Sequence, residues 1–249
     1  MPLPAPARSP RDTNHLLVRL GAAAARRLRS RCEPVTLTFG EVLSEADARL
    51  GHVYFPVQGF ISVLATVGQA HALEVGLIGT EGMLGSTLAL GVPTSPLQAL
   101  VQGDGTALRM SAARFRAELV ASPGLRDLMH LYCYVLLRQT GQAAACVHYH
   151  AVPARLARWL LMTLDRTAGT ELQLTQEFLG RMLGVRRVGI TQAASRLQDA
   201  GHISYHRGAI TVRDRAGLLD EACDCYRADQ RSYAALLGRP APRRPRPAR

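Results

Sequence analysis

The sequence contains no lysine, so all 30 basic side chains are arginines, and with 19 acidic side chains they give a net charge of +11. It has no apolar run near the roughly 20 residues needed to cross a bilayer. Its first 31 residues contain no continuous hydrophobic stretch of the kind found in signal peptides. These absences argue against membrane insertion and secretion. The 249 residues suffice for one large or two ordinary domains, and the positive charge favours nucleic acid as the partner.

Cysteines and catalytic motifs are also scarce. Five cysteines, an odd number, do not form the dense, even framework of a secreted disulfide scaffold, so we expect a reducing, cytoplasmic compartment. The chain has no Gly-rich phosphate loop, no His-Glu metal motif and no nucleophile elbow. The sequence therefore predicts a protein that is not an enzyme.

The arginines are concentrated in three regions. Residues 1–31 hold seven Arg and one Asp, a net charge of +6, and residues 236–249 hold five Arg and no acid, a net charge of +5. We expect disordered basic tails at residues 1–14 and 236–249. Between residues 175 and 213, six Arg against two acids give +4 within a region that has a foldable pattern. This third region is the better candidate for a specific contact.

The N-terminal half has short apolar runs separated by Gly and Pro. Leu and Ala spaced three or four apart predict a helix over residues 15–28, and Ser111 is a candidate N-cap for a helix through Val120. Many short strands favour an antiparallel sandwich or barrel. The strands are predicted at residues 35–39, 53–55, 60–64, 73–75 and 103–108.

A long helical pattern follows from residue 123 to residue 150. A helix of about 25 residues is ~38 Å long, longer than an ordinary globular helix, and an apolar stripe of this length suits a partner helix. We therefore predict a dimerisation helix; the alternative is a central core helix of one domain. The predicted dimer contacts are Leu125, Leu128, Tyr132, Val135, Leu136, Ala143 and Val147.

The C-terminal third has the pattern of a winged helix-turn-helix. A helix is predicted over residues 152–164, and Thr175 can cap a further helix that ends at Gly184, where glycine permits the positive φ of a tight turn. The second helix, from about residue 187 to residue 200, turns Ile190, Ala193, Ala194 and Leu197 inward. Residues 202–206 and 209–212 then predict a two-stranded wing, joined by an Arg-Gly turn.

The block LTQEFLGRMLGVRRVGITQAASRLQDAGHI at residues 174–203 resembles the Crp/Fnr family of bacterial transcription regulators. VYFPVQGFISV at residues 53–63 and IGTEGMLG at residues 78–85 are similar to its sensor half. The resemblance covers residues 15–230 and implies an α+β fold with an N-terminal antiparallel β-roll, a long dimerisation helix and a C-terminal winged helix-turn-helix. The implied divisions are a cyclic-nucleotide-binding-like sensor at 15–122, the dimer helix at 123–150 and the DNA-binding domain at 151–235.

The resemblance places DNA contacts on the start and outer face of the second helix. Arg187 can make a bidentate contact to guanine, and Gln192 suits adenine. Val188 stands where many relatives carry an acidic base reader, so we expect an operator that differs from the best-known consensus. The alternative is that these arginines only form a solvent-exposed helix face. The predicted DNA-binding residues are Thr175, Arg186, Arg187, Val188, Thr191, Gln192, Ser195, Arg196, His206 and Arg207.

The sensor departs from the family pattern. Cyclic-nucleotide binders use a Gly-Glu pair for the ribose and an Arg-Ser or Arg-Thr pair for the phosphate, but Ser86 stands at the Glu position and residues 51–108 contain no cation. Burying an unpaired charge costs several kcal/mol. We therefore expect cyclic AMP not to be a tight conventional ligand. The candidate effector pocket is Leu84, Gly85, Ser86, Thr87 and Gln98.

No cofactor is predicted. An N-terminal iron–sulfur cluster needs four thiolates, and Cys32 stands there alone. The sequence also gives little support for haem, because a lone histidine is more often a surface residue than an axial ligand. The haem-ligand candidates are His52, His71 and Cys32.

The remaining cysteines and histidines form two close pairs, Cys223 with Cys225 and His148 with His150. Neither has a second pair at zinc-site spacing, so ordinary surface chemistry is expected. Cys133 and Cys146 are candidates for a redox link across a two-fold axis, or for buried small hydrophobes.

These observations predict a homodimeric, sequence-specific transcription regulator that is cytoplasmic and nucleoid-associated. Its partners would be a second copy of itself, double-stranded DNA with a near-palindromic operator, an unidentified small-molecule effector and, as a further candidate, RNA polymerase. A signal in the β-roll would reposition the recognition helices. The alternative is a metabolite- or nucleotide-binding sensor that acts through protein contacts.

Overall fold

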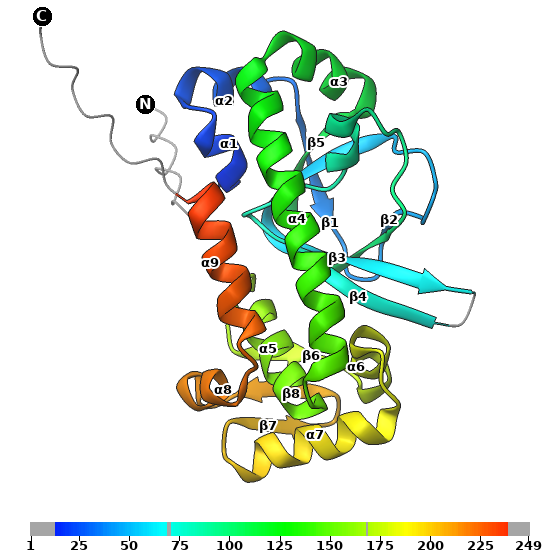
Figure 1. Ribbon diagram of the computed structural model, residues 1–249, viewed down its shortest axis with the longest axis vertical. Coiled ribbons are helices and arrows are strands. Elements are labelled where there is room, and N and C mark those ends of the chain that lie inside the picture. The colour runs from blue at the N-terminus through cyan, green and yellow to red at the C-terminus, as the bar shows by residue number, and fades with distance from the viewer. Residues whose placement is uncertain (1–12, 69–70, 168, 239–249) are drawn as a thin grey trace, which may run out of the picture.

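The computed structural model describes residues 13–68, 71–167 and 169–238. An N-terminal β-roll is joined by one long helix to a C-terminal unit of helices and a small sheet (Figure 1). This arrangement is the α+β architecture predicted from the sequence. Within the described residues, no helix is both long enough and apolar enough to cross a bilayer.

The β-roll is an antiparallel sheet in which β1 (Glu33–Leu37), β5 (Gln98–Ser111), β3 (His52–Val67) and β4 (His71–Ile78) are neighbours in that order, and β2 (Val42–Ser44) also pairs with β5. The strands predicted at residues 53–55 and 60–64 are one continuous strand, β3. Its register against β5 shifts three times between Pro56 and Ile61. Such irregularities bend a strand without ending it, so β3 continues through the predicted gap.

The N-terminal segment forms two helices, α1 (His15–Arg19) and α2 (Ala22–Arg29), where one was predicted. Gly21, with φ of 80°, separates them. Asn14, predicted in the disordered tail, is fully buried: its side chain accepts a hydrogen bond from the backbone of Leu16 and donates to the carbonyl oxygens of Pro56 and Gly82. These bonds attach the start of α1 to the β-roll, which corrects the tail boundary at residue 14.

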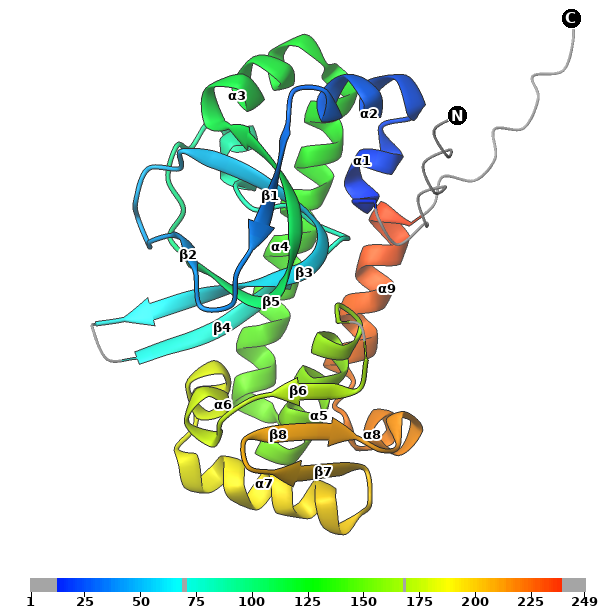
Figure 2. The same ribbon diagram turned by 180° about the vertical axis from the view of Figure 1, so that it is seen from behind.

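Ser111 caps α3 (Ala112–Ala121) as predicted, with its hydroxyl accepting from the backbone N–H of Arg114. Ser122 caps α4 (Pro123–Tyr149), which has Pro123 in its first turn, a position where the missing N–H costs nothing. A short 3-10 helix, η2 (Ser86–Leu90), packs beside it. The 27 residues of α4 run from the β-roll down to the C-terminal unit (Figure 2).

Most of the apolar stripe predicted for dimer contact on α4 lies in the chain's own core. Leu125, Leu128, Tyr132, Val135 and Ala143 are buried, Leu136 is half-buried, and Val147 is the exposed exception. The Tyr132 hydroxyl accepts from the backbone N–H of Met83, which ties the helix to the β-roll. A second apolar face of α4 is exposed instead, with Leu131, Tyr134 and Leu137. Apolar spacing shows that a helix face is buried but does not show what buries it.

The C-terminal unit contains α5 (Val152–Leu164), β6 (Glu171–Gln173), α6 (Gln176–Leu183), α7 (Arg187–Asp199), β7 (Ile203–His206) and β8 (Ala209–Val212). The sheet has the order β6-β8-β7, so it has three strands where two were predicted. Three residues of pairing are too short to give β6 an alternating pattern of its own. After α8 (Arg215–Glu221), α9 (Cys225–Leu237) runs back beside α4 toward the β-roll (Figure 1).

The end of α9 corrects the predicted C-terminal tail. Leu237 is 3% exposed and packs in the same core as Leu16, Phe115 and Leu125. Residues 236 and 237 are therefore structured and belong to the N-terminal core, although the sequence assigned them to a tail. Of the rest of that predicted tail, residues 239–249 lie outside the described residues, as do residues 1–12 of the N-terminal tail.

Candidate nucleic-acid interface

The helix-turn-helix is formed by α6 and α7. The Thr175 hydroxyl accepts from the backbone N–H of Phe178 and caps α6, and Gly184 ends that helix in the left-handed region with φ of 63°. Gly180 lets the chain fold tightly, because a Cβ there would lie 2.9 Å from the carbonyl oxygen of Val185. The capping and turn residues predicted from the sequence thus occupy the predicted places.

One face of α7 is buried and the other is open. Ile190, Ala193, Ala194 and Leu197 are at most 2% exposed, as predicted. Val188, near the start of this helix, is 65% exposed. All of the predicted DNA contacts at this helix are exposed: Arg186, Arg187, Val188, Thr191, Gln192, Ser195 and Arg196.

Gln176, which the sequence analysis missed, organises this surface from the start of α6. Its side-chain oxygen accepts from Arg187 Nε at 3.3 Å and from the Thr191 hydroxyl at 3.0 Å. Arg187 and Thr191 are one turn apart on α7, so a single amide positions both. Eleven to fifteen residues separate the partners in sequence, and only the packed turn brings them together.

The wing lies beside this surface. Arg207 and Gly208 form its turn with φ of 49° and 82°, and His206 and Arg207 are exposed. Thr175, Gln176, Arg187, Tyr205 and Arg207 line one groove between the helices and the wing. Ser195 lies outside this groove lining, and Arg196 turns to Glu221 of α8, with 3.3 Å between their charged groups.

The predicted effector residues belong to two segments, one around the start of η2 and one at the start of β5. Leu84 to Thr87 lie around the start of η2, where Gly85 has φ of 94° and Ser86 is buried. Gln98 lies opposite Leu64 and donates a hydrogen bond to Glu45. The Thr87 hydroxyl is buried without a protein partner among the described residues.

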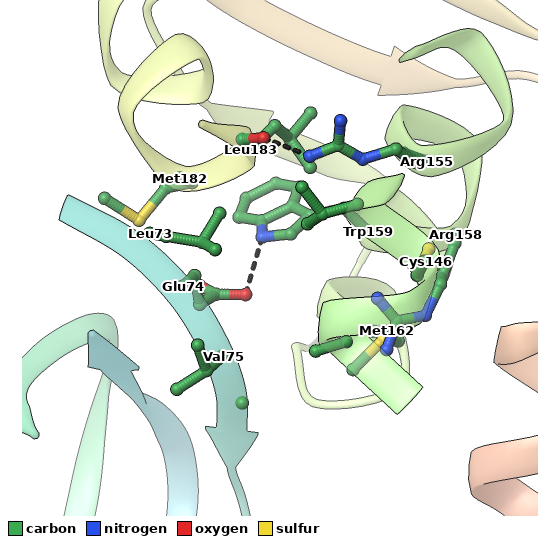
Figure 3. A pocket seen from close by; sticks show the side chains of 13 residues that line it. Leu73, Glu74, Val75, Cys146, Arg155, Arg158, Trp159, Met162, Met182 and Leu183 are labelled. Atoms are coloured by element: carbon green, nitrogen blue, oxygen red, sulfur yellow. Dashed lines mark hydrogen bonds between the residues drawn. The ribbon is translucent and has the colours of Figure 1, made fainter. Parts of the chain in front are cut away.

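The β4 strand contacts the C-terminal unit directly (Figure 3). Glu74 of β4 accepts from the indole N–H of Trp159 at 2.8 Å and from the Ser62 hydroxyl at 2.7 Å. Leu73 lies against the helix-turn-helix turn, since a Cβ on Gly184 would be 2.9 Å from its Cδ1. The β-roll therefore touches both α5 and the turn before the predicted recognition helix.

Burial raises the pKa of Glu74 to about 7, although the hydrogen bonds from Ser62 and Trp159 and the charges of Arg158 and Arg166 act to lower it. Folding thus favours the protonated carboxyl group, because its pKa in the folded chain lies above the ordinary value of 4.5. Folding takes up a proton at Glu74 between these two pH values, so the contribution of Glu74 to stability is greatest at low pH and falls as the pH rises from 4.5 to about 7.

We expect Glu74→Gln to remove this dependence, worth about 3 kcal/mol across the window. The measurement is urea unfolding of the wild type and the variant between pH 4.5 and 8. Glu177→Gln, an exposed substitution of the same kind, is the matched control and should keep the wild-type slope. An unchanged slope in the Glu74 variant would contradict the assignment.

Comparison with known proteins shows which domains and structures this chain is similar to. Residues 154–221 match the Crp-like helix-turn-helix domain. FixK2 from Bradyrhizobium japonicum is 15% identical with a TM-score of 0.63, covering 77% of this chain and 98% of that one. The c-di-GMP-responsive global regulator CLP of Xanthomonas campestris is 16% identical with a TM-score of 0.61, covering 75% and 96%. TTHA1359 of Thermus thermophilus, a transcriptional regulator of the CRP/FNR family, is 18% identical with a TM-score of 0.61, covering 76% and 98%.

No curated protein matches the chain. The family match covers the helix-turn-helix region, and the solved structures are similar in fold over most of the chain. They also agree with the order of β-roll, long helix and winged helix-turn-helix seen in the structure. The chain therefore has the fold of the Crp/Fnr transcription regulators, with a Crp-like helix-turn-helix domain at residues 154–221.

Proposed function

We propose that the protein is a homodimeric, sequence-specific transcription regulator that binds near-palindromic double-stranded DNA. The observation that carries this proposal is the open face of α7, where predicted base-contacting side chains are exposed beside a wing that carries Arg207. In a two-fold dimer of this kind, two such helices enter successive major grooves about 34 Å apart. Arg187 would contact guanine, Gln192 adenine and the exposed Val188 a thymine methyl group.

The second apolar face of α4 supports dimerisation. Leu131, Tyr134 and Leu137 are 41%, 50% and 69% exposed. Gly141 and Ala144 continue this face toward the C-terminal end of the helix, where small side chains permit close approach of a partner helix. We infer that this face takes the role that the sequence assigned to the buried stripe.

The β-roll would act on the DNA-binding surface through β4. Leu73 and Glu74 connect it to Gly184 and Trp159, so a change in the β-roll can shift the turn that begins α7. Regulation then requires two conformations of the protein that differ at this contact, and an effector that binds one conformation more tightly than the other. Because residues 51–108 supply no cation, a conventional cyclic AMP complex is not the proposed signal.

Selection of sequences from a random duplex pool, with the purified protein at roughly physiological salt, tests the proposal, because such salt weakens nonspecific phosphate binding. The expected result is a symmetric motif with half-sites one helical turn apart. Recovery of no motif, with or without cell-extracted small molecules, would contradict it.

Arg187→Ala is expected to relax base preference at one position of each half-site by about 1–3 kcal/mol, because a bidentate contact to guanine is lost. Competition binding with the selected site, a site mutated at that base, and random DNA measures the effect. Arg231→Ala on the exposed side of α9 removes the same charge away from this surface and should leave the preference intact. Equal losses on specific and random DNA from Arg187→Ala would reject its role as a base reader.

A further inference from the structure

Four potential metal ligands from separate parts of the chain meet at the lower end of α4. Cys146 lies in the last turn of that helix and His150 is its C-cap, whereas Cys223 precedes α9 and Cys225 is the first residue of α9. One ligand atom from each, three Sγ and a ring nitrogen, lie within 4.8 Å of one another. The three cysteines are buried and His150 is half-buried.

This grouping corrects the sequence interpretation of these residues as surface groups. The sequence suggested the neighbours Cys223 with Cys225 and His148 with His150, but His148 is exposed and outside the group. Cys146 takes its place, 77 residues from Cys223 along the chain. Zinc-site spacing could not reveal a site whose two halves belong to different structural units.

We propose that Cys146, His150, Cys223 and Cys225 bind a single metal ion in tetrahedral coordination, and that Zn²⁺ is the ion they fit best. Three cysteines and one histidine are a standard closed zinc set, and thiolates disfavour Mg²⁺ and Ca²⁺. The Sγ atoms of Cys146 and Cys223 are 3.5 Å apart, as are Cys225 Sγ and His150 Nδ1. Zn–S bonds of about 2.3 Å place two sulfurs roughly 3.7 Å apart in a tetrahedron, so these two pairs need shift by only a few tenths of an ångström. All four ligand atoms lie within 4.8 Å of one another, so the wider separations close by about an ångström when the ion binds.

Other uses of these side chains fit less well. An iron–sulfur cluster distributes its thiolates over several iron atoms, so its ligands stand farther apart than those of one ion. A Cys146–Cys223 disulfide would bring the two sulfurs to about 2.05 Å. It would not explain why Cys225 Sγ lies 3.5 Å from His150 Nδ1.

The surroundings also suit a bound ion. Gln142 Nε2 donates to Cys225 Sγ at 3.0 Å, the kind of outer hydrogen bond that orients a ligand. Arg158 lies beside Cys146 (Figure 3), and its positive charge offsets the negative charge that three thiolates leave around Zn²⁺. Asp229 in turn holds Arg158 at 2.7 Å.

The position gives the ion a structural role. Cys146 and His150 belong to α4, which packs on the β-roll, whereas Cys223 and Cys225 belong to the segment that follows the helix-turn-helix domain. His150 also lies at the break between α4 and α5. A bound ion therefore fixes the end of the long helix to the start of α9, independently of any DNA contact.

The experiment uses the full-length protein purified under reducing conditions. We expect elemental analysis to find about one zinc per chain. After removal with a chelator, titration with Co²⁺ should give the visible bands of tetrahedral cobalt and a thiolate charge-transfer band, and Zn²⁺ should abolish both. Absence of retained zinc together with absence of the tetrahedral cobalt spectrum would overturn the proposal.

Variants locate the site. Cys223→Ser is expected to weaken Co²⁺ binding at least tenfold, and His150→Ala to change the cobalt spectrum while retaining the thiolate band. Cys133→Ser, on the same helix as Cys146, and His148→Ala are matched controls that should bind like the wild type. A Cys223→Ser variant with the wild-type spectrum would place the metal elsewhere and reject the proposal.

Thiol alkylation of the wild-type protein gives a readout that does not depend on the folding of a variant. Added Zn²⁺ should protect Cys146, Cys223 and Cys225 and leave the reactivity of Cys32 and Cys133 unchanged. Equal reactivity with and without zinc would contradict the site. Recovery of metal-free protein with a Cys146–Cys223 disulfide would identify a redox pair in its place.

Discussion

Leu137→Glu is expected to convert the protein from a dimer to a monomer and to weaken binding to the selected DNA site at least a hundredfold. Leu137 is the most exposed of the large apolar side chains on the open face of the middle of α4. In a two-fold interface the same patch of both subunits meets, so the substitution places two carboxylates in one apolar contact. Loss of the dimer removes the tethering of the second half-site, which is worth about 10²–10⁴ in affinity.

Light scattering measures the mass and a DNA titration measures the affinity. Val120→Glu is the matched control, because Val120 is 81% exposed on α3, away from this face, and both properties should stay at the wild-type level. Leu128→Glu separates the two faces of α4: Leu128 is buried in the chain's own core, so this change should lower stability. A Leu137→Glu variant that remains dimeric and keeps its affinity would move the interface elsewhere.

The helix-turn-helix could be predicted closely because its determinants are local. The Thr175 cap, the Gly184 turn and the four inward residues of α7 lie within some 25 residues and act through hydrogen bonds and packing between adjacent helices. A positive φ requires glycine wherever the turn occurs, so the signal is readable without the rest of the chain. The wing turn at Arg207 and Gly208 is local in the same sense.

Features that depend on distant packing could not be predicted in the same way. Both faces of α4 carry apolar side chains, and only the β-roll and α9 decide that Leu128 is internal while Leu137 is open. The return of α9 places Leu237 in the same hydrophobic core as Leu16, more than 200 residues away in sequence. The grouping of Cys146 with Cys223, the link from Gln176 to Arg187 and the contact of Glu74 with Trp159 likewise arise only after the elements pack.

The effector pocket shows the limit of carrying a family pattern onto a divergent sequence. Ser86 is buried at the start of η2, and its carbonyl oxygen faces the Cys133 thiol at 3.5 Å. The Gln98 side chain donates a hydrogen bond to the Glu45 carboxylate. Ser86 and Gln98 thus have protein partners of their own, and their place in an effector pocket stays a prediction.

The second large effect concerns the ion pair that joins the β-roll to the C-terminal unit. Glu81, in the loop after β4, accepts from Arg166 at 2.7 Å and from the backbone N–H of Gly79, and Arg166 also donates to the carbonyl oxygen of Met162. Burial acts to raise the pKa of Glu81, but Arg166 and the backbone N–H groups lower it below the ordinary value. The pair therefore stabilises the fold above pH 4.5 and loses that contribution as the carboxylate is protonated at lower pH.

Arg166→Ala is expected to lower the free energy of unfolding by about 3–5 kcal/mol at pH 7, because it leaves the Glu81 carboxylate largely buried without its counter-charge. Arg109→Ala is the control: Arg109 makes a similarly short ion pair with Glu33, at 2.8 Å, but Glu33 is 57% exposed, so solvent screens the pair and its loss should change stability much less. The double variant Arg166→Met with Glu81→Gln removes both charges and should recover much of the stability. If Arg166→Ala costs no more than Arg109→Ala in urea unfolding, the buried pair does not hold the two units together.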